Sequence, residues 1–140
     1  MEHIDTIALY RNRRTGQYRI QPFGRLQNGS SQPFGEQQHL SADIAEEDLL
    51  RAVLVNLQKN KSQRYTAALA PKTDDAEWRR QLKEDQLIEV EASRSGYRLI
   101  PSKQVHNSFG SIDNMIALFP ITEFLSRGGE IIIRLFAQIP

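Results

Sequence analysis

The fold is decided by a segment that occurs twice in the chain, as Gly16-Gln17-Tyr18-Arg19-Ile20-Gln21-Pro22 and as Gly96-Tyr97-Arg98-Leu99-Ile100-Pro101. Each copy begins at a glycine and then alternates apolar with polar side chains, which predicts a β-strand with one buried face. Each copy also leads into a polar loop that contains a Phe-Gly pair, at residues 34–35 and 109–110. The repeated order of signals predicts two similar units, about 1–70 and 71–140, within one domain.

The segment before each copy alternates in the same way. Residues 4–10 precede the first copy, residues 87–91 precede the second, and a short turn ending in glycine joins each pair. This arrangement predicts two antiparallel β-hairpins. The later run Met115–Phe119 is apolar on both faces, which predicts a central strand.

Two capping signals predict where helices begin. Asp43 is followed three residues later by Glu46, and Asp74 is followed by Glu77 in the same way. An aspartate at the cap can accept a hydrogen bond from a free backbone N–H, while the glutamate reaches back. We therefore expect one helix from Asp43 to about residue 59 and a shorter one from Asp74.

The final segment, residues 130–139, fits two structures. Its three consecutive isoleucines favour a strand, but its apolar positions also recur at helical spacing, and we interpret it as a helix. Neither unit alone would cover its apolar sheet face and its helix stripe, so the two must pack together. The sequence therefore predicts a single α/β domain of the α+β type over residues 1–140. It should have a mostly antiparallel central sheet built from two hairpin-loop-strand-helix units, with the helices packed on it.

Composition excludes several kinds of function. The 140 residues include no cysteine, so disulfides, thiolate zinc sites and cysteine nucleophiles are impossible. Eighteen basic and 17 acidic side chains give a net charge of +1, which provides no overall attraction to nucleic acid or to an anionic membrane. Acidic residues at the N-terminus are unlike a signal peptide, and no apolar run reaches membrane-spanning length. We expect a cytoplasmic protein that does not contact the membrane.

The motifs of common enzymes are missing from the sequence. It contains no glycine-rich phosphate loop, no dinucleotide fingerprint and no Gly-x-Ser-x-Gly elbow. His39 and His106 occupy similar places in the two units, but no carboxylate partner accompanies them, and two histidines make a weak metal site. We expect no catalytic residue, no cofactor and no metal, and hence a protein that is not an enzyme.

Two groups of charged residues are candidates for binding. Basic side chains at 11–14 and 59–65 would suit the phosphates of a small nucleic-acid-binding module, although a solvated turn and a helix C-terminus explain them more simply. Acidic side chains gather around the second hairpin, at Glu84, Asp85, Glu89 and Glu91. Like charges on one hairpin cost stability unless a partner uses them. We predict that these four carboxylates bind a partner protein, with Trp78 as an aromatic anchor unless it is a core residue.

Three parts of the sequence carry a family resemblance: Leu40–Leu54, Leu87–Val90 with Tyr97–Pro101, and Met115–Ile139. In these parts the chain resembles the immunity proteins of bacterial contact-dependent growth inhibition systems. The resemblance implies a cytosolic α/β inhibitor that binds the C-terminal toxin domain of a large surface-delivered protein, commonly a nuclease acting on transfer RNA. It implies that the inhibitor occludes the active site of its cognate toxin, without contacting nucleic acid directly. The family has no catalytic residues to carry over.

Overall fold

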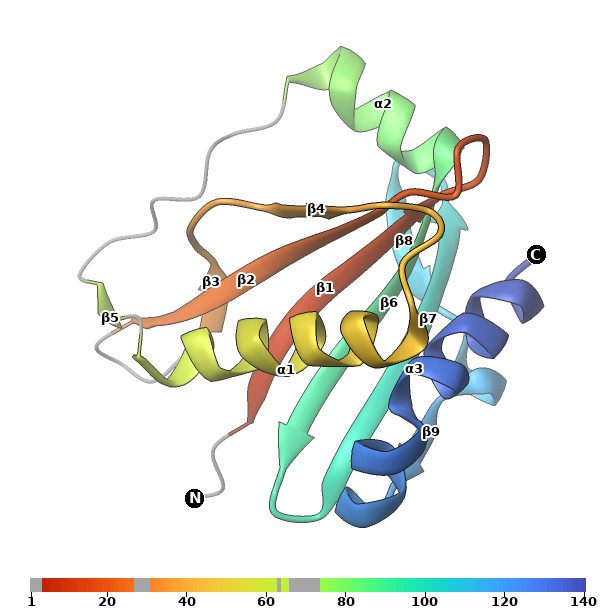
Figure 1. Ribbon diagram of the computed structural model, residues 1–140. Helices are drawn as coiled ribbons and strands as arrows, with labels where there is room; N and C mark the ends of the chain where they lie inside the picture. Colours follow the sequence, from red (N-terminus) through yellow and green to blue (C-terminus); the bar gives the residue numbers. More distant parts are fainter. Residues whose placement is uncertain (1–3, 27–30, 63, 66–73) are drawn as a thin grey trace.

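A curved, mostly antiparallel sheet forms the centre of the molecule (Figure 1). The computed structural model describes residues 4–26, 31–62, 64–65 and 74–140. The main path of the sheet runs in the order β3 (Ser31–Pro33), β2 (Tyr18–Leu26), β1 (Asp5–Asn12), β6 (Asp85–Ser93), β7 (Gly96–Val105) and β8 (Ser108–Ser111). Three short strands pair beside this path, namely β4 (Gln38–Leu40) and β5 (Arg64–Tyr65) on β2, and β9 (Ala117–Phe119) on β7.

The two predicted hairpins are confirmed. They are β1–β2 and β6–β7, and the antiparallel pairing of β1 with β6 joins them into one sheet. Register then decides which side chains share a face. Leu9 lies opposite Ile20 on one side and Ile88 on the other, and all three are fully buried. Because strand side chains alternate, the residues directly before and after each of these three point to the opposite face of the sheet.

Two helices cover the apolar face of the sheet, α1 (Glu46–Ser62) and α3 (Ile121–Gln138) (Figure 1). Leu49 and Val53 of α1 and Phe124, Ile132 and Phe136 of α3 are buried in the core between the helices and the strands. The predicted α+β class, with helices packed on a mostly antiparallel sheet, is therefore confirmed.

Two side-chain amides fasten these helices to the sheet. Gln86 of β6 donates from Nε2 to the carbonyl oxygens of Phe136 and Ile139, at 3.1 and 3.2 Å. Both carbonyls lie at the C-terminal end of α3, where Ile139 is the capping residue and its backbone N–H also donates to Phe136. On the neighbouring strand β1, the backbone N–H of Thr6 donates to Oδ1 of Asn60 of α1 at 2.9 Å. Each amide thus links the C-terminal part of a helix to a strand of the sheet.

The third helix, α2 (Asp75–Glu84), precedes β6 and starts as predicted. Asp74 is its N-cap, and the Asp74 carboxylate accepts the backbone N–H of Glu77 at 2.8 Å. Leu82 is buried on its inner side. Among the described residues, no helix combines the length and the apolar character that crossing a membrane requires.

Two predicted helix starts were wrong. The first helix begins at Glu46, because the carbonyl of Ala45 accepts the first helical N–H groups and the Asp43 carboxylate instead accepts the hydroxyl of Ser41. The last helix begins at Ile121, directly after Pro120, and not near residue 130.

The predicted central strand over Met115–Phe119 was also wrong. A 3-10 helix takes Asp113–Met115, and β9 pairs only with β7, at one side of the sheet. Met115 and Phe119 pack against the core, while the side chain of Leu118 is 56% exposed. The continuous apolar run therefore reflects packing against the core together with one exposed leucine, and not burial on both faces.

Candidate functional site

The predicted partner-binding residues lie on or beside the face of the sheet opposite α1 and α3, called here the far face. Glu89 lies in register with Ala8 and Ile100, and Glu91 with Thr6 and Arg98. Their neighbours Ile88 and Val90 point into the core under the helices. The alternation of β6 therefore brings Glu89 and Glu91 together on a face that neither α1 nor α3 covers.

Glu89 is the unusual carboxylate of this face. Its side chain is half-buried on a central strand, and it forms no hydrogen bond or ion pair with the described residues. Burial raises the pKa of Glu89, and the nearby charge of Glu91 raises it further. The surroundings of Glu89 in the isolated chain therefore disfavour its charged form.

Glu91 is less exceptional. Its carboxylate lies 3.4 Å from the guanidinium of Arg98 on the neighbouring strand, and half of the Arg98 side chain is exposed. A solvated pair at this distance contributes little to stability. Arg98 can turn toward another carboxylate at small cost, so Glu91 remains usable by a partner.

Glu84 is already paired within α2. Arg80 donates from Nη1 to its carboxylate at 3.0 Å, and Asn12 donates at 3.3 Å. The hydrogen bond from Arg80, followed by that from Asn12, lowers the pKa of Glu84. Arg80 also binds Glu77, with Nε at 2.9 Å, and this hydrogen bonding lowers the pKa of Glu77 to about 2. Arg80 of the same helix therefore supplies a cation for Glu84 within the chain.

Asp85 is not on the surface at all. Its side chain is 1% exposed, and its Oδ2 lies 3.0 Å from Nη1 of Arg19. The guanidinium of Arg19 also lies over the ring of Tyr10, 4.1 Å from the ring centroid. Asp85 was expected to face a partner, but the register of β1 with its two neighbours places it inside a buried ion pair.

Trp78 packs within the chain. Its ring meets Phe109 edge-on, with centroids 5.9 Å apart, and its Nε1 donates to the carbonyl of Asn107 at 2.9 Å. Phe109 in turn contacts Tyr10 on the far face. The side chain of Trp78 is half-buried, so it fixes α2 to the β7–β8 hairpin and leaves only part of its surface for a partner.

The histidines and basic residues are spread over separate regions. His39 lies beside Arg14 and Arg19 in a polar hollow at the start of β2, whereas His106 lies at the exposed turn between β7 and β8. No group of three potential metal ligands occurs in the described part of the chain. Most of the basic cluster at 59–65 lies outside the side chains that the structure describes.

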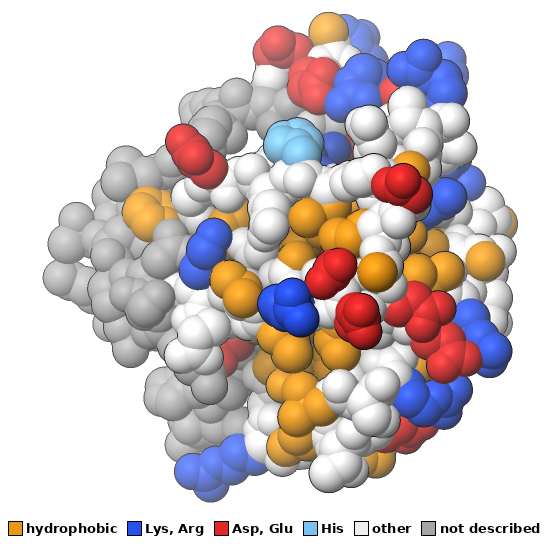
Figure 2. Space-filling view, viewed as in Figure 1, with side chains coloured by type: hydrophobic (Ala, Val, Ile, Leu, Met, Phe, Trp, Pro, Cys, Tyr) orange, Lys and Arg blue, Asp and Glu red, His pale blue; other side chains and the backbone are white. Residues whose placement is uncertain are grey.

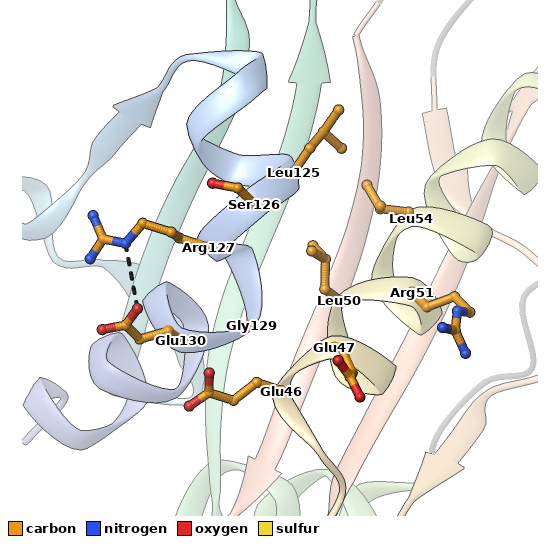
Figure 3. Close-up of a pocket in the computed structure, with 10 residues that line it drawn as sticks. All are labelled: Glu46, Glu47, Leu50, Arg51, Leu54, Leu125, Ser126, Arg127, Gly129 and Glu130. Carbon is orange, nitrogen blue, oxygen red and sulfur yellow. Dashed lines mark hydrogen bonds and ion pairs between the residues drawn. The ribbon is translucent and has the colours of Figure 1, made fainter.

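A second hollow, which the sequence did not suggest, lies between α1 and α3. The two helices touch at Gly129, where a Cβ atom would stand 2.1 Å from the carbonyl oxygen of Glu46. Beside this contact the helices leave a groove of about 450 Å³. Leu50 and Leu54 point from α1 toward α3, and Leu125 leans toward them from α3 (Figure 3). In the sequence, the glycine pair Gly128-Gly129 within an apolar helix was the signal that could have indicated this contact.

The groove opens on the face shown in Figure 2. Hydrophobic side chains reach the surface over the centre and lower part of that face, with acidic and basic side chains beside them. The exposed fraction of Leu125 is 47%, a large value for a leucine on a helix that is packed against the sheet. An apolar surface with a charged border is typical of an interaction site.

Known proteins show which fold this is. No protein-family model and no curated protein matches the chain. A solved structure of a protein of unknown function from Neisseria meningitidis matches with a TM-score of 0.72 and 14% identity, over 100% of this chain and 98% of that one. A chain of the CdiA-CT/CdiI toxin and immunity complex from Yersinia pseudotuberculosis matches with a TM-score of 0.57 and 13% identity, over 94% and 97%. The fold is shared along nearly the whole length.

Proposed function

We propose that this chain is an immunity protein, which binds the toxin domain of a contact-dependent growth inhibition system and neutralises it. Three observations support the proposal. The fold is shared with a chain of a toxin and immunity complex, and the sequence resembles that of the immunity proteins. The third is the far face, where Glu89 and Glu91 lie together and Glu89 has no cation among the described residues.

Glu89 carries the proposal most directly. A half-buried carboxylate without a cation destabilises the chain that contains it, and such costs are typical of functional sites. A lysine or arginine of a toxin, placed over Glu89 and Glu91, would supply the missing positive charge. Pairing of charges across an interface accelerates association and selects the partner.

The chemistry of the toxin follows from the same charge. A nuclease that binds transfer RNA needs basic side chains around its active site, because the substrate is a polyanion. Carboxylates on a rigid sheet can contact these side chains and exclude the RNA. We therefore propose a nuclease toxin that is inhibited by occlusion of its active site.

A titration tests this function. The toxin domain encoded by the gene next to that of this protein is mixed with transfer RNA. Increasing amounts of this protein are added, and RNA cleavage is measured. We expect inhibition to be complete at one chain per toxin, since an occluding inhibitor acts by stoichiometry. Complete inactivation by a small fraction of an equivalent would indicate an enzyme instead.

The alternative class has its own signature in the same experiment. A nucleic-acid-binding module would protect the RNA without binding the toxin. Its affinity for RNA would fall about a thousandfold or more between about 50 and 200 mM salt if several phosphates were contacted. Protection of that kind, with no toxin complex on gel filtration, would contradict the immunity function.

A further inference from the structure

We infer that the groove between α1 and α3 is a docking site for a basic amphipathic helix of a partner protein. The inference rests on the groove alone and does not depend on the proposed toxin. The groove lies on the side of the sheet opposite Glu89, so one small domain bound at the far face would leave it open.

The apolar floor of the groove requires an apolar stripe on the occupant. Leu50, Leu54 and Leu125 line it, and Leu50 and Leu54 lie one helical turn apart on α1. Side chains spaced by one turn present a continuous ridge, which matches the spacing of residues on one face of another helix. Each leucine covered in this way loses apolar contact with water.

The walls decide between a helix and an extended strand. Both walls are α-helices, whose backbone groups are bonded within the helix, so the groove offers no ladder of free N–H and C=O groups. An extended segment docked there would leave its own backbone unpaired on the buried side. A helical segment satisfies its backbone internally, so the occupant is a helix.

The rim decides the charge of that helix. Arg51 and Arg127 point outward, away from the groove, on its two sides (Figure 3). Arg51 pairs with Asp48 at 3.2 Å, and Arg127 pairs with Glu130 at 3.4 Å, each on its own helix.

Two carboxylates of the rim have no cationic partner among the described residues. Glu46 and Glu47 form no ion pair with the described residues. The N-terminus of α1 carries only about half a positive charge, which three acidic residues in its first turn exceed. The rim therefore attracts lysine or arginine.

A second copy of this chain does not supply such a helix from its described residues. The half-buried Leu50 and Leu54 of α1 and the exposed Leu125 of α3 belong to the groove itself. Outside the groove, α1 and α3 each have one exposed large apolar side chain among the described residues, Val55 and Ile121, which is too few for an apolar stripe, and Leu82 of α2 is buried. On α2, Arg80 forms ion pairs with Glu77 and Glu84 of its own helix. The occupant is therefore carried by a different protein.

A designed peptide tests the site without knowledge of the natural partner. The probe is a leucine and lysine peptide of about 18 residues, long enough to form a helix, with its leucines on one face. Two comparison peptides have glutamate in place of lysine, or the same composition in scrambled order. Binding to the full chain is followed by titration, and the contacted residues are mapped from amide chemical shifts.

We expect the leucine and lysine peptide to bind and to shift the amides around Leu50, Leu54 and Leu125. Leu125→Ser should weaken binding about tenfold, because a covered leucine side chain is lost. Leu118→Ser is the matched control, since Leu118 is also an exposed leucine but lies on β9, outside the groove. It should leave the affinity unchanged. Glu46→Gln combined with Glu47→Gln should weaken binding of the lysine peptide and keep the fold.

Several results would overturn the inference. These are equal binding of the lysine and glutamate peptides, shifts confined to the far face, or equal effects of Leu125→Ser and Leu118→Ser. A dimer in sedimentation that Leu125→Ser dissociates would assign the groove to a second copy instead. A toxin that binds at Glu89 while the peptide fails here would leave the proposed function standing and remove only this site.

Discussion

Arg19 and Asp85 form an ion pair in the interior of the protein, with Nη1 and Oδ2 3.0 Å apart. The buried Nε and Nη2 atoms of Arg19 have no hydrogen-bond acceptor among the described residues, so its charge depends on Asp85 and on the ring of Tyr10. Loss of one member of a buried pair leaves the other charge uncompensated.

Asp85→Ala should therefore lower the free energy of unfolding by about 3 kcal/mol. Urea unfolding followed by circular dichroism measures the change. Replacement of both partners, with Arg19→Met and Asp85→Leu, should cost less than the single substitution, because no charge is then stranded. A single variant as stable as the wild type would show that Asp85 is solvated and available to a partner, as the sequence suggested.

Gly129 provides a test of the contact between α1 and α3. In an isolated helix, Gly→Ala stabilises by up to about 1 kcal/mol. Here the new Cβ would meet the carbonyl oxygen of Glu46, which belongs to a backbone that cannot rotate away. We expect Gly129→Ala to destabilise the chain by about 1–3 kcal/mol in thermal or urea unfolding.

Ser126→Ala is the matched control, because Ser126 is exposed on the same helix. Its effect should stay within about 0.5 kcal/mol. Stabilisation by Gly129→Ala would mean that the two helices are farther apart than described, and the groove beside them would then have a different shape.

Glu89 predicts an unusual dependence of stability on pH. Burial raises its pKa above the value of about 4.3 that applies in the unfolded chain. Its contribution to stability is therefore present below that unfolded value and is lost as the pH rises through the folded pKa. Glu89→Gln removes the ionisation, so the variant should melt a few degrees higher than the wild type at pH 7.

The advantage of Glu89→Gln should shrink as the pH falls and disappear below about pH 4, where the wild-type carboxylate is protonated in both states. Melting curves across this range measure it. Glu91→Gln serves as the comparison and should change stability by less than about 0.5 kcal/mol. A destabilising effect of Glu89→Gln at pH 7 would mean that the carboxylate has a partner within the chain.

Much of the architecture could be predicted from local patterns. Turn glycines at 16 and 96, both with positive φ in the structure, and the alternation around them were sufficient for the two hairpins. The capping aspartate at 74 was sufficient for α2, because its hydrogen bond spans only three residues. The same alternation placed Glu89 and Glu91 on one face, opposite Ile88 and Val90.

The remaining features depend on contacts between distant parts of the chain. Asp85 looked like a member of an acidic surface, because its cation, Arg19, is 66 residues away and reaches it across β1. The groove depends on the contact of α1 with α3 at Gly129. The glycine pair in the sequence indicates a close contact but does not say which helix makes it. The division into two similar units, 1–70 and 71–140, stays a prediction.

The central claim is that Glu89 on the far face binds a toxin, and the affinity for the toxin domain encoded by the neighbouring gene tests it most directly. Calorimetry measures this affinity for the wild type, for Glu89→Gln and for Arg14→Gln as a control. Arg14 is exposed in the β1–β2 turn, away from Glu89. We predict that the wild type binds one toxin, that Glu89→Gln weakens binding at least about tenfold although the fold is more stable, and that Arg14→Gln binds like the wild type. Unchanged affinity for Glu89→Gln would contradict the assignment of the far face, and the absence of any wild-type complex would contradict the immunity function itself.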